Sequence, residues 1–328
     1  FIMSTLQTCT SSSRPSHGAG VIAYETDTTR TIISDGSNWH IYMPDPFSRA
    51  VCAFSLRQIV PDYTGNCVKV RRSSDNAEAD IGFTDTGVID QTALLAHTGT
   101  GGSDAGYVVK WYDQGPYSMD ATNTTAAQQP TIVSAGAVVV SNSKPSILFG
   151  GATVLKQPLY VNATPSTTVW KCEPPSPTAA IAVCELTDVS VSADHTLCGM
   201  FFGGYFNNYG DGLGASMNGG TMYFKRVAST IGQLELWDTS ALASTTQAIA
   251  WYNFDGTTTG ISTNGGSEQT STTAPNPWSG GTQQNIGAIQ TSSDPWDGKI
   301  SEIAIYHVDR STQKAAILAN VNAFYGTY

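Results

Sequence analysis

Short segments with apolar residues at every second position, or in brief continuous runs, recur along most of the chain. Alternation with a period of two is typical of strands that bury one face, and short apolar runs are typical of strands buried on both. Segments of these kinds span residues 20–24, 30–33, 39–43, 68–70, 107–112, 137–140, 146–149, 181–186, 222–227, 233–237, 248–254, 260–263 and 300–306. Gly, Asn, Asp, Ser and Pro lie between them, as turns require. The pattern therefore predicts an all-β protein.

One segment early in the chain has a helical pattern instead. Residues 89–96 contain closely spaced alanines and leucines without the alternation of a strand. Asp90 is suited to be the N-cap, since its side chain can accept a bond from a free backbone N–H of the first turn. Gly99 follows closely enough to end the helix. We therefore predict one short helix here.

A second helix is predicted near the end of the chain, over residues 312–324. Either Asp309 or Ser311 can cap it, and Gly326 ends it. Apolar residues at i, i+4 and i+7 give the segment one apolar stripe, which predicts that it packs on the sheet beside it. The residues of this stripe are Ile317, Leu318, Val321 and Phe324.

The first three predicted strands form a meander of about two dozen residues, which is too small to be stable alone. Pro44-Asp45-Pro46 then makes a stiff linker. We therefore predict two parts: an N-terminal β-meander over residues 1–46 that anchors or oligomerises, and a β-sandwich over residues 47–328. Three meanders around one axis would cover Ile22, Ile33 and Ile41, so a homotrimer is expected.

The composition agrees with an all-β protein and excludes some partners. Aromatic residues make up 10%, enough to fill a core, while charged residues make up only 13%. The formal net charge is −10, which argues against nucleic acid and anionic membranes as partners. No apolar run is long enough for a membrane-spanning helix, so no membrane insertion is expected. The first residues lack the basic and apolar regions of a signal peptide.

The six cysteines indicate neither zinc nor a redox motif. They are Cys9, Cys52, Cys67, Cys172, Cys184 and Cys198, and none forms a C-x-x-C pair. Metal-type spacing is absent, so a zinc site is not expected. An even count permits disulfides, although a chain of this length does not need them. We favour buried free thiols.

Charge is concentrated in one stretch, from Ala53 to Gln114. A charge cluster between strands is usually a structural network of hydrogen bonds at a sheet edge, although ion-pair networks and functional sites look alike in sequence. We therefore assign these residues a structural role. The cluster consists of Arg71, Arg72, Asp75, Glu78 and Asp80, with Asp113 closing the stretch.

The N-terminal segment resembles a short module that recurs in tailed-bacteriophage fibre and other virion proteins. The residues that carry the resemblance are Arg14-Pro15, Gly20 to Thr28, and Ser34-Asp35-Gly36-Ser37-Asn38-Trp39. The same residues would also make a plain hairpin pair around Trp39. The resemblance implies a virion protein, made in the bacterial host cytoplasm and placed on the virion surface.

The rest of the chain resembles concanavalin-like, laminin-G-like lectin domains through its closing strand, Trp296 to Tyr306. Three further motifs resemble the catalytic-domain sandwich of the fungal α-L-arabinofuranosidase B family. They are Ala53-Phe54-Ser55-Leu56-Arg57, Val70-Arg71-Arg72-Ser73-Ser74-Asp75-Asn76 and Trp111-Tyr112-Asp113-Gln114. Both resemblances imply an all-β, concanavalin-like β-sandwich (jelly roll) with two short helices.

The catalytic acids that this family implies do not map onto the sequence. A retaining glycosidase needs two carboxyl groups about 5 Å apart. Where the family has its glutamate, this chain has Ser216-Met217-Asn218, and Thr291 stands where the family has an aspartate. The sugar-contacting pair of adjacent cysteines is also absent. We therefore expect no enzymatic activity.

Sugar binding remains the expected role of the sandwich, through aromatic faces and polar groups in loops. The candidate carbohydrate-binding residues are Tyr205, Asn207, Asn208, Tyr209, Asp211, Trp278 and Trp296. For each aromatic residue, filling the core is the competing interpretation. No cofactor is expected. Calcium is the one metal considered, with Asp211, Asp294 and Asp297 as candidate ligands.

We thus expect a structural virion protein that presents a lectin-like domain to host surface glycans, with other virion proteins as partners. The alternative is a secreted glycoside hydrolase of the arabinofuranosidase type. Secretion would favour disulfides and glycans at Asn123 and Asn162, which begin Asn-x-Thr sequons. Assembly in a reducing cytoplasm would favour free thiols instead.

Overall fold

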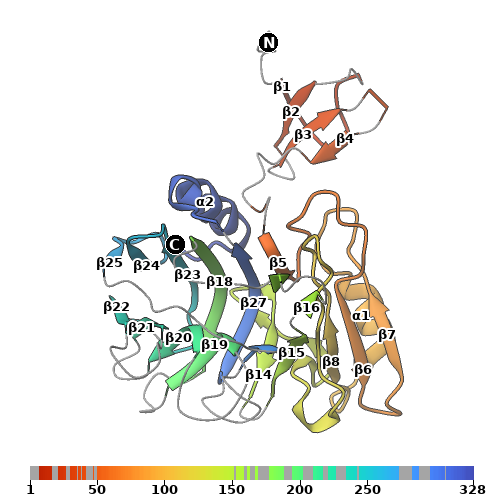
Figure 1. Ribbon diagram of the computed structural model, residues 1–328. Helices are drawn as coiled ribbons and strands as arrows, with labels where there is room; N and C mark the ends of the chain where they lie inside the picture. Colours follow the sequence, from red (N-terminus) through yellow and green to blue (C-terminus); the bar gives the residue numbers. More distant parts are fainter. Residues whose placement is uncertain are drawn as a thin grey trace.

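The computed structural model describes residues 7–16, 21–26, 30–34, 36–37, 39–41, 47, 50–150, 153–158, 161–162, 167–168, 177–187, 194–201, 210–216, 221–226, 234–241, 244–272, 283–287, 296–306 and 308–328. It describes the backbone alone at residues 7, 30, 31, 33, 40 and 41, between 156 and 168, between 194 and 241, and at 283–285. The chain forms an N-terminal sheet and a larger β-sandwich (Figure 1). The predicted all-β class is confirmed.

The N-terminal sheet has the strand order β1-β2-β3-β4. Its strands are β1 (Gln7–Cys9), β2 (Ile22–Glu25), β3 (Arg30–Ser34) and β4 (Trp39–Ile41). The three predicted strands are confirmed, and β1 joins them in parallel with β2. The register separates the three isoleucines of the trimer model. Ile22 pairs with Ile33, whereas Ile41 pairs with Ile32 and so belongs to the opposite face.

Two ladders of strands build the sandwich, and they share β8 (Gly106–Trp111). The end of β8 pairs with β9, whereas its beginning pairs with β10. The front ladder continues from β7 (Glu78–Ile81) and β6 (Val68–Arg72) through β8 to β9 (Ala121–Thr122), β15 (Leu155–Pro158), β26 (Gln283–Ile286), β19 (Asp194–Phe201), β20 (Gly210–Ser216), β21 (Thr221–Arg226) and β22 (Leu234–Ala241).

The back ladder passes from β8 through β10 (Thr131–Ser134), β14 (Ile147–Phe149), β27 (Gly298–Tyr306), β18 (Thr178–Leu186), β23 (Gln247–Phe254) and β24 (Thr259–Thr263) to β25 (Gln269–Ser271). Strand β5 (Ala50–Ser55) pairs with the end of β27, and β11 (Ala137–Val138) pairs with β10. Two short hairpins complete the set, β12–β13 (Val140–Ser141 and Lys144–Pro145) and β16–β17 (Val161–Asn162 and Thr167–Thr168).

The back ladder is covered on both faces, which explains its apolar sequence. Every residue of β23 is buried, and every residue but one of β18 is buried. Strands buried on both sides read as continuous runs of Ala, Ile and Val rather than as an alternation. One face packs against the front ladder, where Leu155 and Ile286 belong to the same buried cluster as Ile303.

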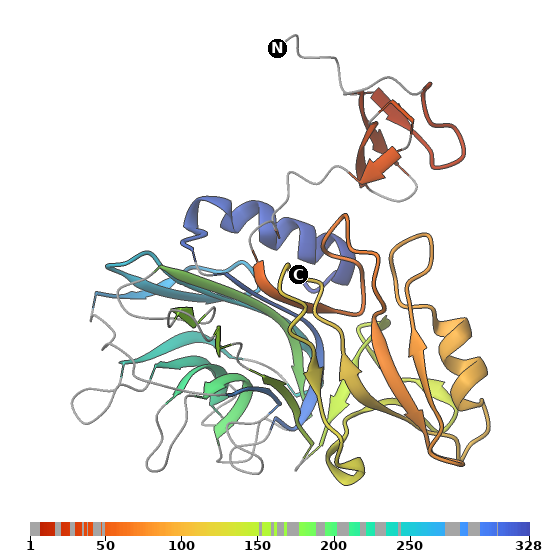
Figure 2. The ribbon, with the colours of Figure 1, turned by 45° about the vertical axis from the view of Figure 1, so that its right-hand side comes forward.

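The other face of the back ladder is covered by α2 (Lys314–Tyr325), as Figure 2 shows. Ile317, Leu318 and Val321 are buried there as predicted. Phe324 is partly buried against the same cluster, and Tyr325, one residue beyond the predicted end, is buried as well. Gly326 takes the left-handed conformation that ends the helix.

The start of α2 differs from the prediction. A 3₁₀ turn, η2 (Ser311–Gln313), precedes it, and Gln313 at the N-cap makes no capping bond. Asp309 instead accepts a bond from the Ser311 backbone N–H at 2.8 Å. The aspartate therefore binds the first residue of the 3₁₀ turn and does not cap the α-helix.

The early helix, α1 (Gln91–Thr98), has the predicted caps and lies two residues further along the chain than the predicted segment 89–96. The Asp90 carboxylate accepts a bond from the Ala93 N–H at 2.9 Å, and Gly99 closes the helix with a positive φ of 93°. Leu94 joins the core. A further 3₁₀ turn, η1 (Ala126–Gln128), lies between β9 and β10. None of the helices formed by the described residues is both long and apolar enough to cross a membrane.

Candidate functional site

The front ladder has one face toward the core and one face away from it, and the register assigns each residue to a face. Leu155 and Ile286 lie opposite each other and are fully buried. Directly opposed residues of antiparallel strands share a face. Three further opposed positions therefore belong to the core side: Cys198, Leu213 and Phe224. The residues between them belong to the other side, which we call the outer face.

Strand β20 has glycine at three successive positions of the outer face, Gly210, Gly212 and Gly214. Gly199 lies opposite Gly212 on β19, so two neighbouring strands lack side chains at this point. Glycine in a strand interior often marks a place where a ligand approaches the backbone closely. The arrangement leaves a row of bare backbone across the middle of the front ladder.

The strands beside this glycine row place aromatic and polar residues on the same face. On one side, β21 and β22 contribute the opposed pairs Tyr223–Trp237 and Lys225–Glu235. On the other side, β26 contributes Gln283 and Asn285 at outer-face positions. The amides and charges supply hydrogen-bonding groups, and aromatic rings are the usual partners of the apolar faces of sugars. These residue types fit a carbohydrate better than they fit a phosphate or a metal.

Two acidic residues occupy outer-face positions in β19 to β22, Asp194 and Glu235. Asp194 lies opposite Ser216, and Glu235 lies opposite Lys225. Three strand spacings separate β19 from β22, which is about 14 Å. That separation exceeds the distance between the two carboxyl groups of either class of glycosidase. These two acids are therefore not a catalytic pair by themselves.

Two of the predicted carbohydrate-binding residues have a defined place. Asp211 lies on β20 opposite Met200 and Arg226, on the core side and not beside the glycine row. Trp296 is fully buried in the core, so its ring has no open face for a sugar. Its place agrees with the competing interpretation as a core residue. The others lie outside the described residues: Tyr205, Asn207, Asn208, Tyr209 and Trp278.

Sequence reasoning missed the outer face because it interpreted the region around β20 only by composition. Strands β19 and β20 were not predicted. The spacing of Gly210, Gly212 and Gly214 carried a usable signal, since a period of two places all three on one face of a strand.

The predicted charge cluster separates into local contacts. Arg72 forms an exposed ion pair with Asp75 at 2.6 Å, and the guanidinium holds the pKa of that carboxyl well below its usual range. Arg71 instead donates to the Gln129 side chain at 2.7 Å and lies over the Tyr107 ring. These contacts hold a turn and a 3₁₀ segment against β6, as a structural role requires.

Two further acids of the cluster, Asp80 and Asp113, have separate partners. Asp80 accepts a bond from the Tyr112 hydroxyl at 2.7 Å. The Asp113 carboxylate is buried, and burial raises its pKa to about 6 although three N–H bonds act in the opposite direction. Asp113 thus fixes the middle of β5 and the turn after β8. The donors of these three bonds are the backbone N–H groups of Ala53, Gly115 and Met119.

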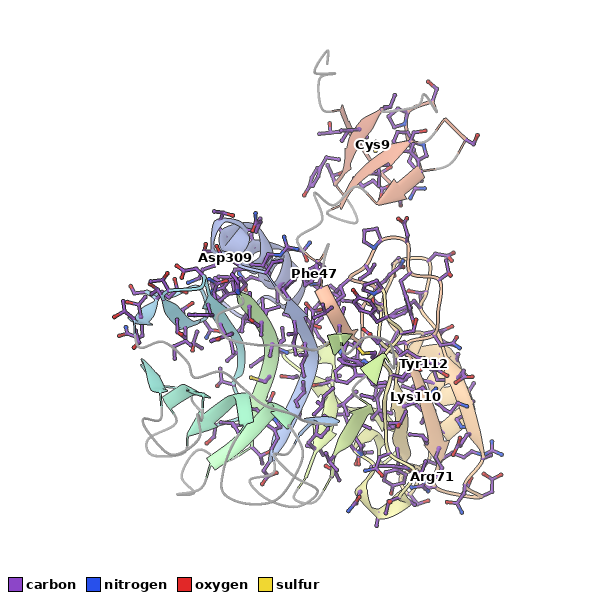
Figure 3. The ribbon with its side chains drawn as sticks, viewed as in Figure 1. Cys9, Phe47, Arg71, Lys110, Tyr112 and Asp309 are labelled. Atoms are coloured by element: carbon purple, nitrogen blue, oxygen red, sulfur yellow. The ribbon has the colours of Figure 1, made fainter. Side chains whose placement is uncertain are left out.

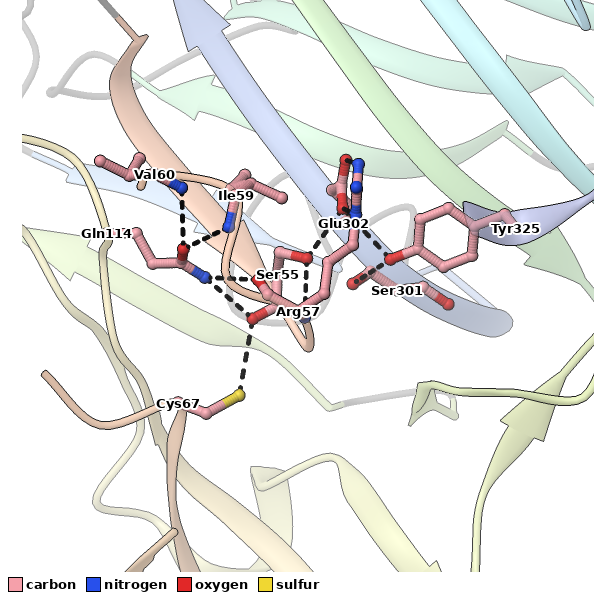
Figure 4. A network of polar contacts seen from close by, with 9 residues as sticks. All are labelled: Ser55, Arg57, Ile59, Val60, Cys67, Gln114, Ser301, Glu302 and Tyr325. Atoms are coloured by element: carbon pink, nitrogen blue, oxygen red, sulfur yellow. Dashed lines mark hydrogen bonds and ion pairs between the residues drawn. The ribbon is translucent and has the colours of Figure 1, made fainter. Parts of the chain in front are cut away.

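A buried ion pair ties the back ladder to α2 (Figure 4). Arg57 donates to both oxygens of Glu302, at 2.8 and 3.0 Å, and both residues are shielded from solvent. Burial lowers the pKa of Arg57, but Glu302 and Tyr325 together raise it above its ordinary value. Glu302 also accepts bonds from the Ser55 and Tyr325 hydroxyls. Every group of the pair has a partner, so the network is structural.

No metal site is evident among the residues that the structure describes, where no three acidic, histidine or cysteine side chains come together. Of the candidate calcium ligands, Asp211 lies on the core side of β20, and Asp297 precedes Gly298 at the start of β27. Asp294 lies outside the described residues. Cys67 and Cys184 are buried, and burial raises the pKa of both thiols.

Comparison with solved structures agrees with this fold. The chain is similar to a GH54 α-L-arabinofuranosidase soaked with a cyclic sulfate inhibitor, with a TM-score of 0.56 and 15% identity. It is also similar to an arabinofuranosidase complexed with arabinofuranosyl-α-1,2-xylobiose, with a TM-score of 0.56 and 16% identity. Each likeness covers 85% of this chain and 65% of the other. No family model and no curated protein matches.

These likenesses overturn the prediction that the chain is not an enzyme. The similar structures are glycosidases, and the likeness extends over 85% of the chain rather than over three short motifs. The prediction rested on two acids sought at fixed places along the sequence, and that search does not test acids that strands and loops could bring together from elsewhere in the chain. At 15–16% identity, the TM-scores of 0.56 establish the fold alone, and the chain spans 65% of the length of these arabinofuranosidases.

Proposed function

We propose that the sandwich is a glycosidase of the arabinofuranosidase type that binds its glycan on the outer face of the front ladder. The observation that carries the proposal is the glycine row of β20, bordered by Tyr223 and Trp237 on one side and by Asn285 on the other. A sugar chain can lie on bare backbone while its hydroxyl groups bond to the neighbouring amides and charges. The sandwich architecture supports the same substrate class.

One candidate for a catalytic carboxyl group lies on the strands of the front ladder, and two others lie in the connection between β26 and β27. Glu235 is the candidate on the strands. It lies opposite Lys225, and Lys225 lies opposite Gly212, so Glu235 is two strands away from the glycine row on the same face. A second carboxyl group has to come within about 5 Å for a retaining mechanism. The connection from β26 to β27 carries Asp294 and Asp297, which are the candidates for that second group.

Hydrolysis of 4-nitrophenyl α-L-arabinofuranoside tests the proposal. We expect turnover by the whole chain, and we expect Gly212→Val to lower kcat/KM by about 100-fold or more because a side chain would fill the bare row. Valine favours strands, so the variant should keep its fold. Gly150→Ala is the control, since nothing lies within 4 Å of the added carbon.

Glu235→Gln and Asp294→Asn should each lower kcat without a matching change in melting temperature. A wild-type chain that binds arabinofuranosides but never releases nitrophenol would overturn the glycosidase proposal. Gly212→Val with unchanged kcat/KM would show that the substrate lies elsewhere.

We further propose that the N-terminal sheet attaches the enzyme to a larger assembly, the virion surface of a tailed phage. The supporting observation is its small core: among the residues of this sheet whose side chains the structure describes, the buried hydrophobic ones are Ala23 and Ile32. A sheet of this size needs further apolar contacts to be stable. A second copy or another virion protein would supply them.

A homotrimer is the expected form, with Ile22 and Ile33 of each copy toward the shared axis because they share a face. Analytical ultracentrifugation should give three times the mass of one chain. Ile22→Asp should shift the mass toward one chain and leave the arabinofuranoside assay unchanged. A monomer whose first residues are still protected from proteolysis would contradict the trimer.

A further inference from the structure

The outer face continues well beyond the glycine row. Gly199 pairs with Asn285, which pairs with Lys156 on β15. Lys156 pairs with Thr122 on β9, and Thr122 pairs with Lys110 on β8. The step from one strand to the next is about 4.8 Å, so Lys110 lies about 19 Å from Gly199 along this line. The line passes through the front ladder without a break in its register.

A group of fixed polar side chains lies at the far end of this line (Figure 3 labels two of them, Lys110 and Tyr112). The Lys110 Nζ lies 3.0 Å from the Asp120 carboxylate and 4.9 Å from the centre of the Tyr112 ring. The Tyr112 hydroxyl donates to Asp80 at 2.7 Å. The side chains of Lys110 and Asp120 are 30% and 22% exposed. We call Lys110, Tyr112 and Asp120 the β8 group.

The β8 group combines the functions that bind a sugar hydroxyl. The Asp120 carboxylate accepts hydrogen bonds, and the Lys110 ammonium has donors beyond the one that it uses for Asp120. The Tyr112 hydroxyl donates to Asp80, so its own oxygen remains an acceptor. The groups hold one another in place before any ligand arrives, which lowers the entropy cost of binding.

We propose that the β8 group is a second subsite, which binds a distant unit of a polysaccharide whose reacting end occupies the glycine row. The inference rests on the proposed function, since the chain must begin at that row. A short glycoside cannot reach both places, because about 19 Å separate them. The enzyme would therefore prefer a polymer to a small glycoside.

Binding of arabino-oligosaccharides of increasing length tests the subsite. Titration calorimetry in the cold, with oligomers from dimer to octamer, should show a step of about tenfold in affinity once the chain reaches the β8 group. Lys110→Met should remove the step and leave kcat/KM for 4-nitrophenyl α-L-arabinofuranoside unchanged. Tyr112→Phe, which keeps the ring packed, should weaken only the long oligomers.

Lys144→Met is the matched control. Lys144 also lies over an aromatic ring, with its Nζ 4.4 Å from the centre of the Phe324 ring on α2, away from the front ladder. The Lys144→Met variant should bind every oligomer with the affinity of the wild type. Affinity that does not change with length, or a step that survives in Lys110→Met, would overturn the subsite.

The two proposals fail in different ways. If affinity rises with oligomer length and depends on Lys110, but the aryl glycoside is not hydrolysed, the glycosidase proposal is wrong and the subsite proposal is supported. If the aryl glycoside is hydrolysed but affinity does not rise with oligomer length, the subsite proposal is wrong and the glycosidase proposal is supported.

Discussion

Glu302→Ala is expected to lower the free energy of unfolding by about 3–5 kcal/mol, because it leaves the Arg57 guanidinium buried without its counter-ion. The Arg57 side chain is 7% exposed and the Glu302 side chain 0%, so water cannot take over the lost contacts. The same change removes one of the two acceptors of the Tyr325 hydroxyl, which should loosen α2. Chemical denaturation followed by tryptophan fluorescence measures the loss.

Two controls separate the buried pair from charge in general. Asp75→Ala breaks the exposed pair with Arg72 and should leave stability unchanged within error. The double variant Arg57→Met/Glu302→Leu should be more stable than Glu302→Ala, since it removes both buried charges and keeps their volume. A Glu302→Ala protein as stable as the wild type would show that the pair is open to solvent.

The sequence predicted the sandwich well where strands keep a simple pattern. β18, β23 and β27 were recognisable because each is an apolar run bounded by turns. The helix signals at Asp90 and Gly326 also held, since capping depends on a few neighbouring residues. These features depend on residues that are close together in the sequence, so the sequence alone is enough to predict them.

The register of long-range pairs could not be predicted in this way. The trimer model grouped Ile41 with Ile22 and Ile33, although one step of register places it on the other face. β19 and β20 were missed because Gly199 and the glycines of β20 are poor strand formers. Their neighbours in the ladder hold them in place, and the sequence does not show which neighbours those are.

The motifs that resemble the arabinofuranosidase family specify the fold rather than the reaction. Asp113 binds the backbone of β5, and the Gln114 side chain bonds to the backbone of Ile59 and Arg57. Arg57 in turn binds Glu302. Two of the three motifs, Ala53 to Arg57 and Trp111 to Gln114, therefore meet in one buried network, which explains why they identified the sandwich.

Gly298→Ala is expected to lower the free energy of unfolding by about 3 kcal/mol, the upper end of the usual cost of overpacking. Gly298 opens β27 between two strands, opposite Leu186 on β18 and Phe149 on β14. A β-carbon there would lie 1.9 Å from the backbone oxygen of Glu185, and a backbone atom cannot turn aside as a side chain can. Thermal and chemical denaturation both report the change.

Gly82→Ala is the matched control, because its added carbon would meet only the Asn66 side chain, at 3.8 Å. It should be neutral or slightly stabilising, since alanine reduces the freedom of the unfolded chain. If Gly298→Ala were equally harmless, β18 and β27 would have to be able to separate at this point. The glycine of the closing Trp296-Asp297-Gly298 phrase would then be a turn residue only. The clash predicts instead that position 298 requires glycine, because the backbones of β18 and β27 approach each other too closely there for a β-carbon.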